Sequence, residues 1–158
     1  MKTNKLPVEV FEAACKFHLL NKSIEYNSRK ITDGVSSDIW HVKTKENIEF
    51  CIKRALAKLT VKEDWYAPIG RSKFEAMYFQ NCFEIAPNNF PKLLGYDNKN
   101  YILAMEWYST DSYMIWKQKL LNKKAEKQDI KNVSDLLIKK HKKFFWNEII
   151  NFSKIFMY

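Results

Sequence analysis

The apolar residues of this chain change their spacing along the sequence, and the order of the changes limits the folds it can adopt. Residues 7–21 have apolar side chains at helical intervals, which are Val10, Ala13, Ala14, Phe17 and Leu20. Residues 28–56 then alternate with a period of two, and the turns TDGVSS and KTKENIE interrupt this pattern. The alternation predicts an antiparallel meander of three strands.

The rest of the chain adds a helix, two strands and further helices. The segment DWYAPIGRSKFEAMYFQNCFEI has Pro68 in its first turn and predicts a helix. We expect this helix to pack on the sheet through the stripe Phe74, Met77, Tyr78 and Cys82. FPKLLGYD and NYILAMEWY predict two more strands, and residues 111–122 and 126–151 predict helices. The expected fold is α+β, with a five-stranded antiparallel sheet followed by an all-helical part.

Composition excludes several classes of protein. The chain has 158 residues, 46% of them hydrophobic, enough for one ordinary domain with a core. Its net charge of +9 comes almost entirely from lysine, whereas base recognition relies on arginine. We therefore expect a solvated basic surface and no nucleic-acid partner. The three cysteines form no CxxC pair and no apolar stretch could cross a bilayer, so we expect a cytoplasmic protein without disulfides, zinc or a membrane partner.

Lys53 stands inside an apolar strand, FCIKRAL, where a lysine is unusual. It shares one face of the strand with Cys51 and Ala55, whose side chains are small enough to leave room for a ligand. One interpretation is a lysine that binds phosphates. The other is a lysine on the wet face of a half-exposed sheet.

Glu75 is the expected partner of Lys53, on the helix that follows. Arg71 lies four residues before it, on the same face. A capping box from Ser72 to Glu75 is the competing interpretation, and it requires the helix to begin at Ser72. Because Pro68 favours an earlier start, we expect Glu75 to form an ion pair with Lys53.

Two further segments complete the candidate site. The turn DGVSS supplies Gly34, Ser36 and Ser37, and its successive N–H groups could form an anion-binding nest. Most such turns are simple hairpins, so this signal is weak by itself. In ILAMEW, we expect the backbone just after Met105 to face a nucleobase, and Ile102 and Ala104 to help line the cleft.

Taken together, these segments resemble a known family. GVSSDIWHV, FCIKRALAKLTVKEDWYAPIGRSKFEA, FPKLLGYD and LAMEWY look like the phosphotransferase family of aminoglycoside kinases, choline-type kinases and methylthioribose kinase. The likeness runs from about residue 25 to 145. It implies a protein kinase-like fold, with an N-terminal ATP-binding lobe at residues 1–108 and an incomplete helical substrate lobe at 109–158.

The resemblance also implies a role for each site residue. Gly34, Ser36 and Ser37 would lie in the loop over the phosphates, Lys53 would bind the α- and β-phosphates, Glu75 would orient Lys53, and Met105, Glu106 and Tyr108 would belong to the adenine hinge. The implied cofactors are ATP and Mg²⁺, the metal in a weak or incomplete site. The implied substrate is a small-molecule hydroxyl of a sugar, amino sugar or choline-like alcohol.

One departure from the family limits these expectations. The family's catalytic loop, His-Gly-Asp followed after four residues by Asn, does not occur in this sequence, and neither does the metal-binding Asp after it. We therefore expect a kinase truncated before its catalytic loop, inactive alone and without catalytic or metal-ligating residues. A nucleotide-binding pseudokinase or scaffold module is the alternative. A basic nucleic-acid-binding domain is less favoured, because no recognition helix or aromatic–basic motif stands out.

The C-terminal helices carry more large apolar residues than one small sheet can cover. These residues are Trp116, Phe144, Phe145, Trp146, Ile149, Ile150, Phe152 and Phe156. An exposed apolar patch of this size is typical of an interface. We therefore expect self-association through these helices.

Overall fold

The structure is a computed structural model that describes residues 5–32 and 34–155, with the side chains described as far as residue 143. The elements follow in the order α1 (Val8–Lys16), β1 (Tyr26–Ile31), β2 (Ser37–Thr44), β3 (Glu49–Ala55), α2 (Arg71–Ile85), β4 (Leu93–Asp97), β5 (Ile102–Glu106), α3 (Trp116–Leu121) and α4 (Lys127–Ile155). The described fold is α+β, as the sequence predicts.

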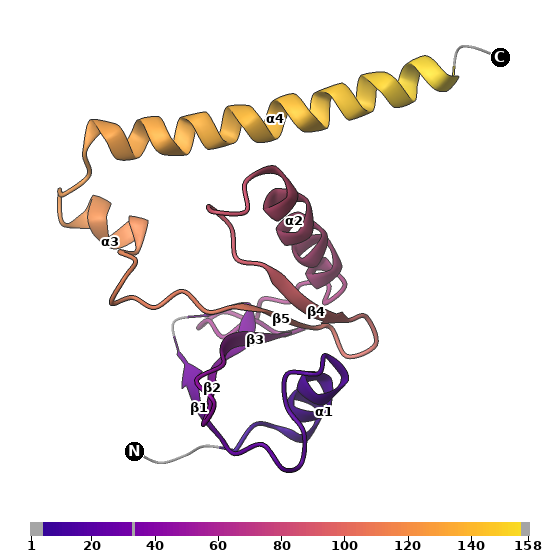
Figure 1. The fold of residues 1–158 in the computed structure, drawn as a ribbon, viewed down its shortest axis with the longest axis vertical. Helices are drawn as coiled ribbons and strands as arrows, with labels where there is room; N and C mark the ends of the chain where they lie inside the picture. Colours follow the sequence, from indigo (N-terminus) through magenta and orange to yellow (C-terminus); the bar gives the residue numbers. More distant parts are fainter. Residues whose placement is uncertain (1–4, 33, 156–158) are drawn as a thin grey trace.

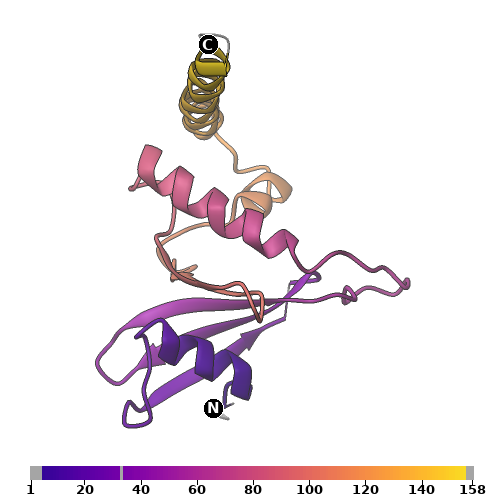
Figure 2. The same cartoon turned by 90° about the vertical axis from the view of Figure 1, so that its right-hand side faces the viewer.

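All five strands belong to one antiparallel sheet with the order β1-β2-β3-β5-β4. The three-stranded meander and the β4–β5 hairpin are therefore joined side by side through β3 and β5, whose register pairs Lys53 with Leu103. Helices α1 and α2 lie on opposite faces of this sheet (Figures 1 and 2). The two faces consequently have different environments, and every strand residue belongs to one or the other.

The α1 face holds the main hydrophobic core. Val10, Ala13 and Ala14 of α1 are buried, as their helical spacing predicts. They pack with Leu6 and Leu20 against alternate residues of the central strands, which are Trp40, Val42, Phe50, Ile52, Ile102 and Ala104. Burial of these large side chains provides most of the driving force for packing α1 against this face of the sheet.

Helix α2 lies on the opposite face, next to β4 and β5, but it packs in a way that differs from the sequence expectation. It begins at Arg71, later than its proline suggests, with Gly70 as its N-cap residue. Its buried residues are Ser72, Ala76 and Cys82. The other members of the predicted stripe point outward, since Phe74, Met77 and Tyr78 are exposed. The prediction that this stripe packs on the sheet is correct only for Cys82.

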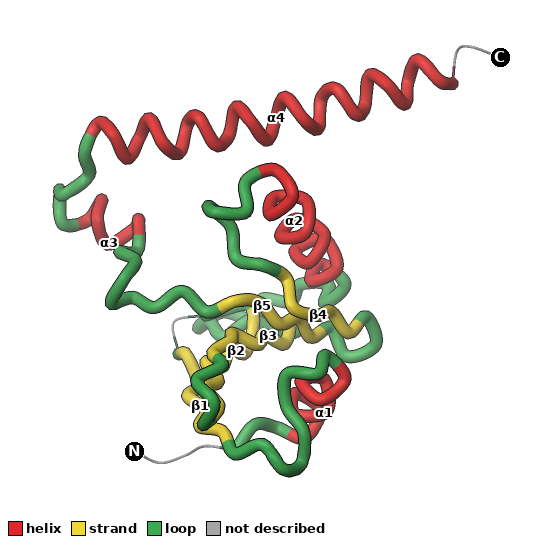
Figure 3. The backbone as a smooth tube through the Cα atoms, viewed as in Figure 1, coloured by secondary structure: helices red, strands yellow, loops and turns green. Residues whose placement is uncertain are grey.

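The C-terminal part differs from the sheet in having no buried core of its own among the described side chains. Residues 111–115, expected to be helical, lie in the connection before α3 (Figure 3), and α3 contains no buried residue. Helix α4 lies on the side of α2 that faces away from the sheet (Figures 1 and 2). Lys140 of α4 lies over the ring of Tyr78, 4.2 Å from its centroid.

Three further expectations have different outcomes. The large apolar side chains expected to be exposed between residues 144 and 156 lie outside the described side chains. Among the described helices, none combines the length and the apolar character that crossing a bilayer requires. The expected division of the chain at residues 108 and 109 stays a prediction.

Candidate functional site

Lys53 and Glu75 form an ion pair between the middle of the sheet and the first turns of α2. The Lys53 side chain is 17% exposed and that of Glu75 is 35% exposed. Ser72 does not cap the helix, because its hydroxyl pairs with the Tyr96 hydroxyl at 3.2 Å. The N-cap residue is Gly70, and no side chain forms a capping hydrogen bond there. The ion-pair interpretation of Glu75 is therefore correct, and the capping-box alternative is wrong.

The strand register decides which residues share the face of Lys53. Its Cα partners are Ile39 on β2 and Leu103 on β5, and residues directly opposite each other in a sheet point to the same side. Two strand positions further along, His41, Cys51 and Met105 lie on this side as well. We call this set, together with Ser37, the Lys53 face.

Ile102 and Ala104 do not belong to the Lys53 face. Both are fully buried in the core beneath α1. The expectation that they line a cleft beside Lys53 is therefore wrong by one residue, because Leu103 and Met105 have the alternation that matches Lys53.

The turn that contains Gly34, Ser36 and Ser37 lies at one end of the Lys53 face. Ser37 begins β2, is buried, and stands opposite Ala55, two residues after Lys53. Gly34 packs closely against β2, since an added Cβ would come within 3.0 Å of Ile39 Cδ1. The structure thus places the predicted turn diagonally across the ladder from Lys53, where a side chain at Gly34 would push on Ile39.

The chain after β5 forms the other end of the Lys53 face. Glu106 is anchored to the neighbouring edge, because its backbone N–H donates to Lys92 O and its carboxylate accepts from the Lys92 N–H. Trp107 then stacks on His41 of β2, with ring centroids 4.1 Å apart. Burial raises the pKa of Tyr108, and the nearby Glu106 and Tyr113 raise it further. This segment is therefore aromatic and held close to the sheet.

The described face has a definite length and polarity. His41, Ile39 and Ser37 are alternate residues of β2, so they span about 13 Å at a rise of about 3.3 Å per residue. Lys53 lies opposite the middle one, Ile39. An elongated ligand on this face would meet aromatic rings at one end, an ammonium group at the centre and a polar turn at the other end.

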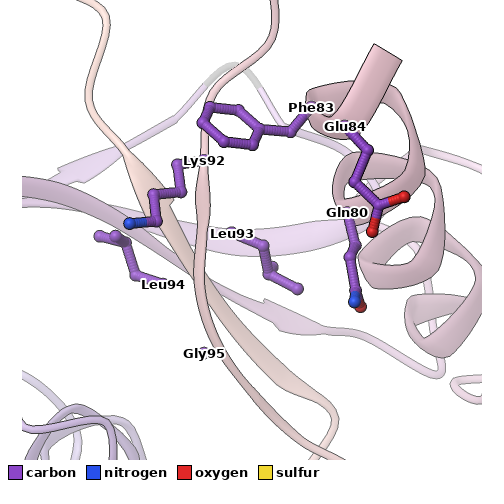
Figure 4. A pocket seen from close by; sticks show the side chains of 7 residues that line it. All are labelled: Gln80, Phe83, Glu84, Lys92, Leu93, Leu94 and Gly95. Atoms are coloured by element: carbon purple, nitrogen blue, oxygen red, sulfur yellow. The ribbon is translucent and has the colours of Figure 1, made fainter. Parts of the chain in front are cut away.

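Two open pockets lie elsewhere on the molecule. A pocket of about 330 Å³ lies between α2 and β4 (Figure 4), and a second of about 470 Å³ lies beside α1. Figure 4 shows Glu84 and Lys92 at the first pocket, and neither pocket includes a residue of the Lys53 face. Among the described residues, no three His, Cys, Asp or Glu side chains cluster closely enough to hold a metal ion.

Sequence reasoning missed two features of the site. Trp107 was predicted only as part of the segment after β5, and its contact with His41 depends on strand register that the sequence does not display. Arg71 was predicted only to share a helix face with Glu75, yet it donates to four backbone carbonyls. The sequence signal for these contacts was the position of Arg71 near the start of the predicted helix.

Comparison with known proteins gives no assignment. The sequence matches no protein-family model, and no curated protein matches it significantly. The function must therefore be argued from the site itself.

Proposed function

We propose that the Lys53 face binds a nucleotide, and that the chain is the nucleotide-binding part of an ATP-dependent phosphotransferase acting on a small-molecule hydroxyl. The observation that carries this proposal is the Lys53–Glu75 ion pair, held between a polar turn and an aromatic segment. The pair joins a strand to the following helix, which is the arrangement of a kinase-like lobe. The family resemblance of the sequence supports the same assignment.

Each part of the face suits one part of a nucleotide. The ammonium group of Lys53 would neutralise phosphate oxygens, and Glu75 would keep that group in place before the ligand arrives. The glycine-bearing turn offers backbone N–H groups and two hydroxyls, which are suitable phosphate donors. The backbone after Met105, beside the ring of Trp107, would receive the base.

Binding and phosphoryl transfer have different requirements. Transfer needs a residue that orients the acceptor hydroxyl and carboxylates that hold Mg²⁺. Glu75 is already paired with Lys53, and the printed sequence contains no His-Gly-Asp loop. The described residues therefore do not fit a magnesium site, and no transfer step is assigned to them. This favours a second candidate, a module that binds nucleotide without transferring phosphate.

The test is nucleotide binding by the intact chain and by Lys53→Ala. We expect the wild-type protein to bind ATP in the high micromolar range or weaker, as measured by calorimetry or thermal shift. Lys53→Ala should weaken ATP binding about tenfold, because the ligand loses the partly buried ammonium group at the centre of this face. Lys131→Ala is the matched control, since it removes the same charge from an exposed pair on α4.

Two outcomes would contradict the proposal. Wild-type protein that binds no nucleotide would exclude the function itself. An unchanged response in Lys53→Ala would exclude this site, whatever else binds. A salt titration separates this proposal from nucleic-acid binding. Contacts to a nucleic-acid backbone weaken steeply as salt rises, whereas we expect ATP binding to persist in moderate salt.

A double-mutant cycle tests the pairing of Lys53 with Glu75. We expect Lys53→Ala and Glu75→Gln to be non-additive in ATP affinity by about 1 kcal/mol or more, because contacting residues in one network are energetically coupled. Titration of the four proteins by calorimetry gives the coupling energy directly. Strict additivity would mean that Glu75 does not position Lys53.

A further inference from the structure

Arg71 connects three separate segments of the chain at the edge of the Lys53 face. Its Nη1 donates to Ala67 O at 3.1 Å and Pro68 O at 2.8 Å. Its Nη2 donates to Ser36 O at 2.6 Å and Leu56 O at 2.8 Å. The four N–H groups of the two terminal nitrogens thus meet four carbonyl oxygens.

Because these four donors are occupied, the two terminal nitrogens of Arg71 are not free to bind a ligand. The effect of Arg71 must pass through the segments that it holds. These are the β1–β2 turn, the residue after β3 and the approach to α2, and Arg71 is the first residue of α2. Glu75 follows one helical turn later and holds Lys53. The guanidinium therefore links the turn to the helix that carries Glu75.

The same contacts set the direction of the turn's peptide groups. Ser36 O also accepts from the Leu56 N–H at 3.1 Å, and Val35 O accepts from the Thr60 N–H at 2.8 Å. In a trans peptide, C=O and N–H point in opposite directions. Fixing these two carbonyls consequently turns the Ser37 N–H away from Arg71 and the Ser36 N–H away from Thr60.

We propose that Arg71 is a positioning residue that holds the β1–β2 turn in register with the Lys53–Glu75 pair, so that both contact the phosphates of one nucleotide. This inference rests on the proposed function and deepens it. A lysine could not replace the arginine, since its three donors lie on a single nitrogen and cannot reach carbonyls on three segments.

The experiment compares the wild-type chain, Arg71→Lys and Arg54→Lys, each titrated with ATP and with adenosine. Arg54 is the matched control: it lies on the α1 face, where it donates to Asp38 at 2.9 Å. We expect Arg71→Lys to weaken ATP binding about tenfold, which corresponds to about 1.4 kcal/mol. Adenosine binding should weaken less than twofold. Arg54→Lys should change neither affinity by more than twofold.

The outcomes separate this inference from the function on which it rests. Wild-type protein that binds neither ligand would overturn both. Binding by the wild type, with ATP and adenosine equally affected in Arg71→Lys, would overturn only the positioning role, because a purely structural residue does not distinguish the two ligands. Unchanged affinities in Arg71→Lys would overturn it as well.

A measurement on the wild-type chain covers the case in which Arg71→Lys does not fold. ATP should slow hydrogen exchange together at the Leu56 and Thr60 amides, which bond to the turn, and in the first turn of α2. Adenosine should leave these amides unchanged. Protection of the turn without protection of α2 would show that the two are not linked and would overturn the proposal.

Discussion

The Cys51 thiol lies two residues before Lys53 on the same face and responds to the same charges. Burial raises its pKa to about 11, with Lys53 lowering it and Glu75 raising it. At pH 8 only about one such thiol in a thousand would then be a thiolate, and the thiolate is the form that reacts. Cys51 should therefore be inert despite its place at the candidate site.

This prediction is tested with a thiol-reactive disulfide reagent at pH 8. Among the three cysteines, Cys15 is half-buried, whereas Cys51 and Cys82 are buried. We expect one fast-reacting thiol in the native chain, lost in Cys15→Ser, and three in denaturant. Rapid modification of Cys51 in Cys15→Ser would contradict the buried position of this thiol.

At the scale of single residues, sequence predicts chemistry better than it predicts which face of a strand a residue occupies. Lys53 was predicted as a site residue because a lysine is unusual inside an apolar strand, and Glu75 was predicted as its partner because it lies on the helix that follows. Ile102 and Ala104 were assigned to the wrong face because residues 102–104 are all buried. A strand that is covered on both sides shows no alternation from which its orientation can be inferred.

At the scale of elements, the existence of each strand could be predicted but the packing of α2 could not. The sequence contains an apolar stripe, yet the face that meets the sheet consists of Ser72, Ala76 and Cys82. These small side chains let the helix approach the strands closely, and close approach brings Glu75 within reach of Lys53. Hydrophobicity alone favours the outward stripe, so pattern analysis gave the wrong orientation.

Asp38 joins the three strands of the meander and should make their stability depend on pH. It lies on β2 and contacts Lys30 of β1 at 2.6 Å and Arg54 of β3 at 2.9 Å. Burial alone would raise its pKa, but the hydrogen bonds and charges of these two partners outweigh burial and lower it. The stabilisation is therefore complete above the unfolded pKa of about 3.9 and is lost as pH falls through the lower folded value.

The corresponding experiment is chemical denaturation of Asp38→Asn between pH 7 and pH 3. We expect a loss of about 1–3 kcal/mol in the free energy of unfolding at pH 7, because Arg54 loses a hydrogen-bonded charge partner. The difference from wild type should shrink below about pH 4. Asp135→Asn, in an exposed pair of α4, is the control and should cost less than about 1 kcal/mol. A difference in the free energy of unfolding that stays the same from pH 7 to pH 3 would contradict the stabilising role of the Asp38 carboxylate.

At the scale of the whole molecule, the order of elements follows from the sequence, whereas the placement of the C-terminal helices does not. Each strand or helix of the sheet region has its own local periodicity, so its existence can be predicted from a short window. Helix α4 contacts α2 and α3 by ion pairs, Lys143 with Glu84 at 3.7 Å and Asp129 with Lys119 at 2.6 Å. Long polar side chains of this kind leave no periodic signal in the sequence.

The exposed stripe of α4 carries the last prediction, which is self-association of the chain. Ile130, Val133 and Leu137 recur at helical spacing, and each is between 44% and 56% exposed. The segment before α4 adds further exposed apolar side chains, which are Tyr113, Met114, Ile115, Leu120 and Leu121. A second copy of the chain offers the same apolar surface, and pairing two such stripes would remove both from water.

Charge opposes this pairing and gives it a distinctive salt dependence. Between residues 127 and 143, α4 carries six lysines against two aspartates, so two copies repel each other at low salt. We therefore expect light scattering coupled to size exclusion to show more dimer in roughly 0.5 M than in roughly 0.05 M salt, since added ions screen this repulsion. Leu137→Lys should shift the chain to monomer. Val8→Lys, at an exposed position of α1 on the other side of the sheet, should not. A chain that stays monomeric at every concentration and salt would mean that α4 is stable with its apolar stripe in water.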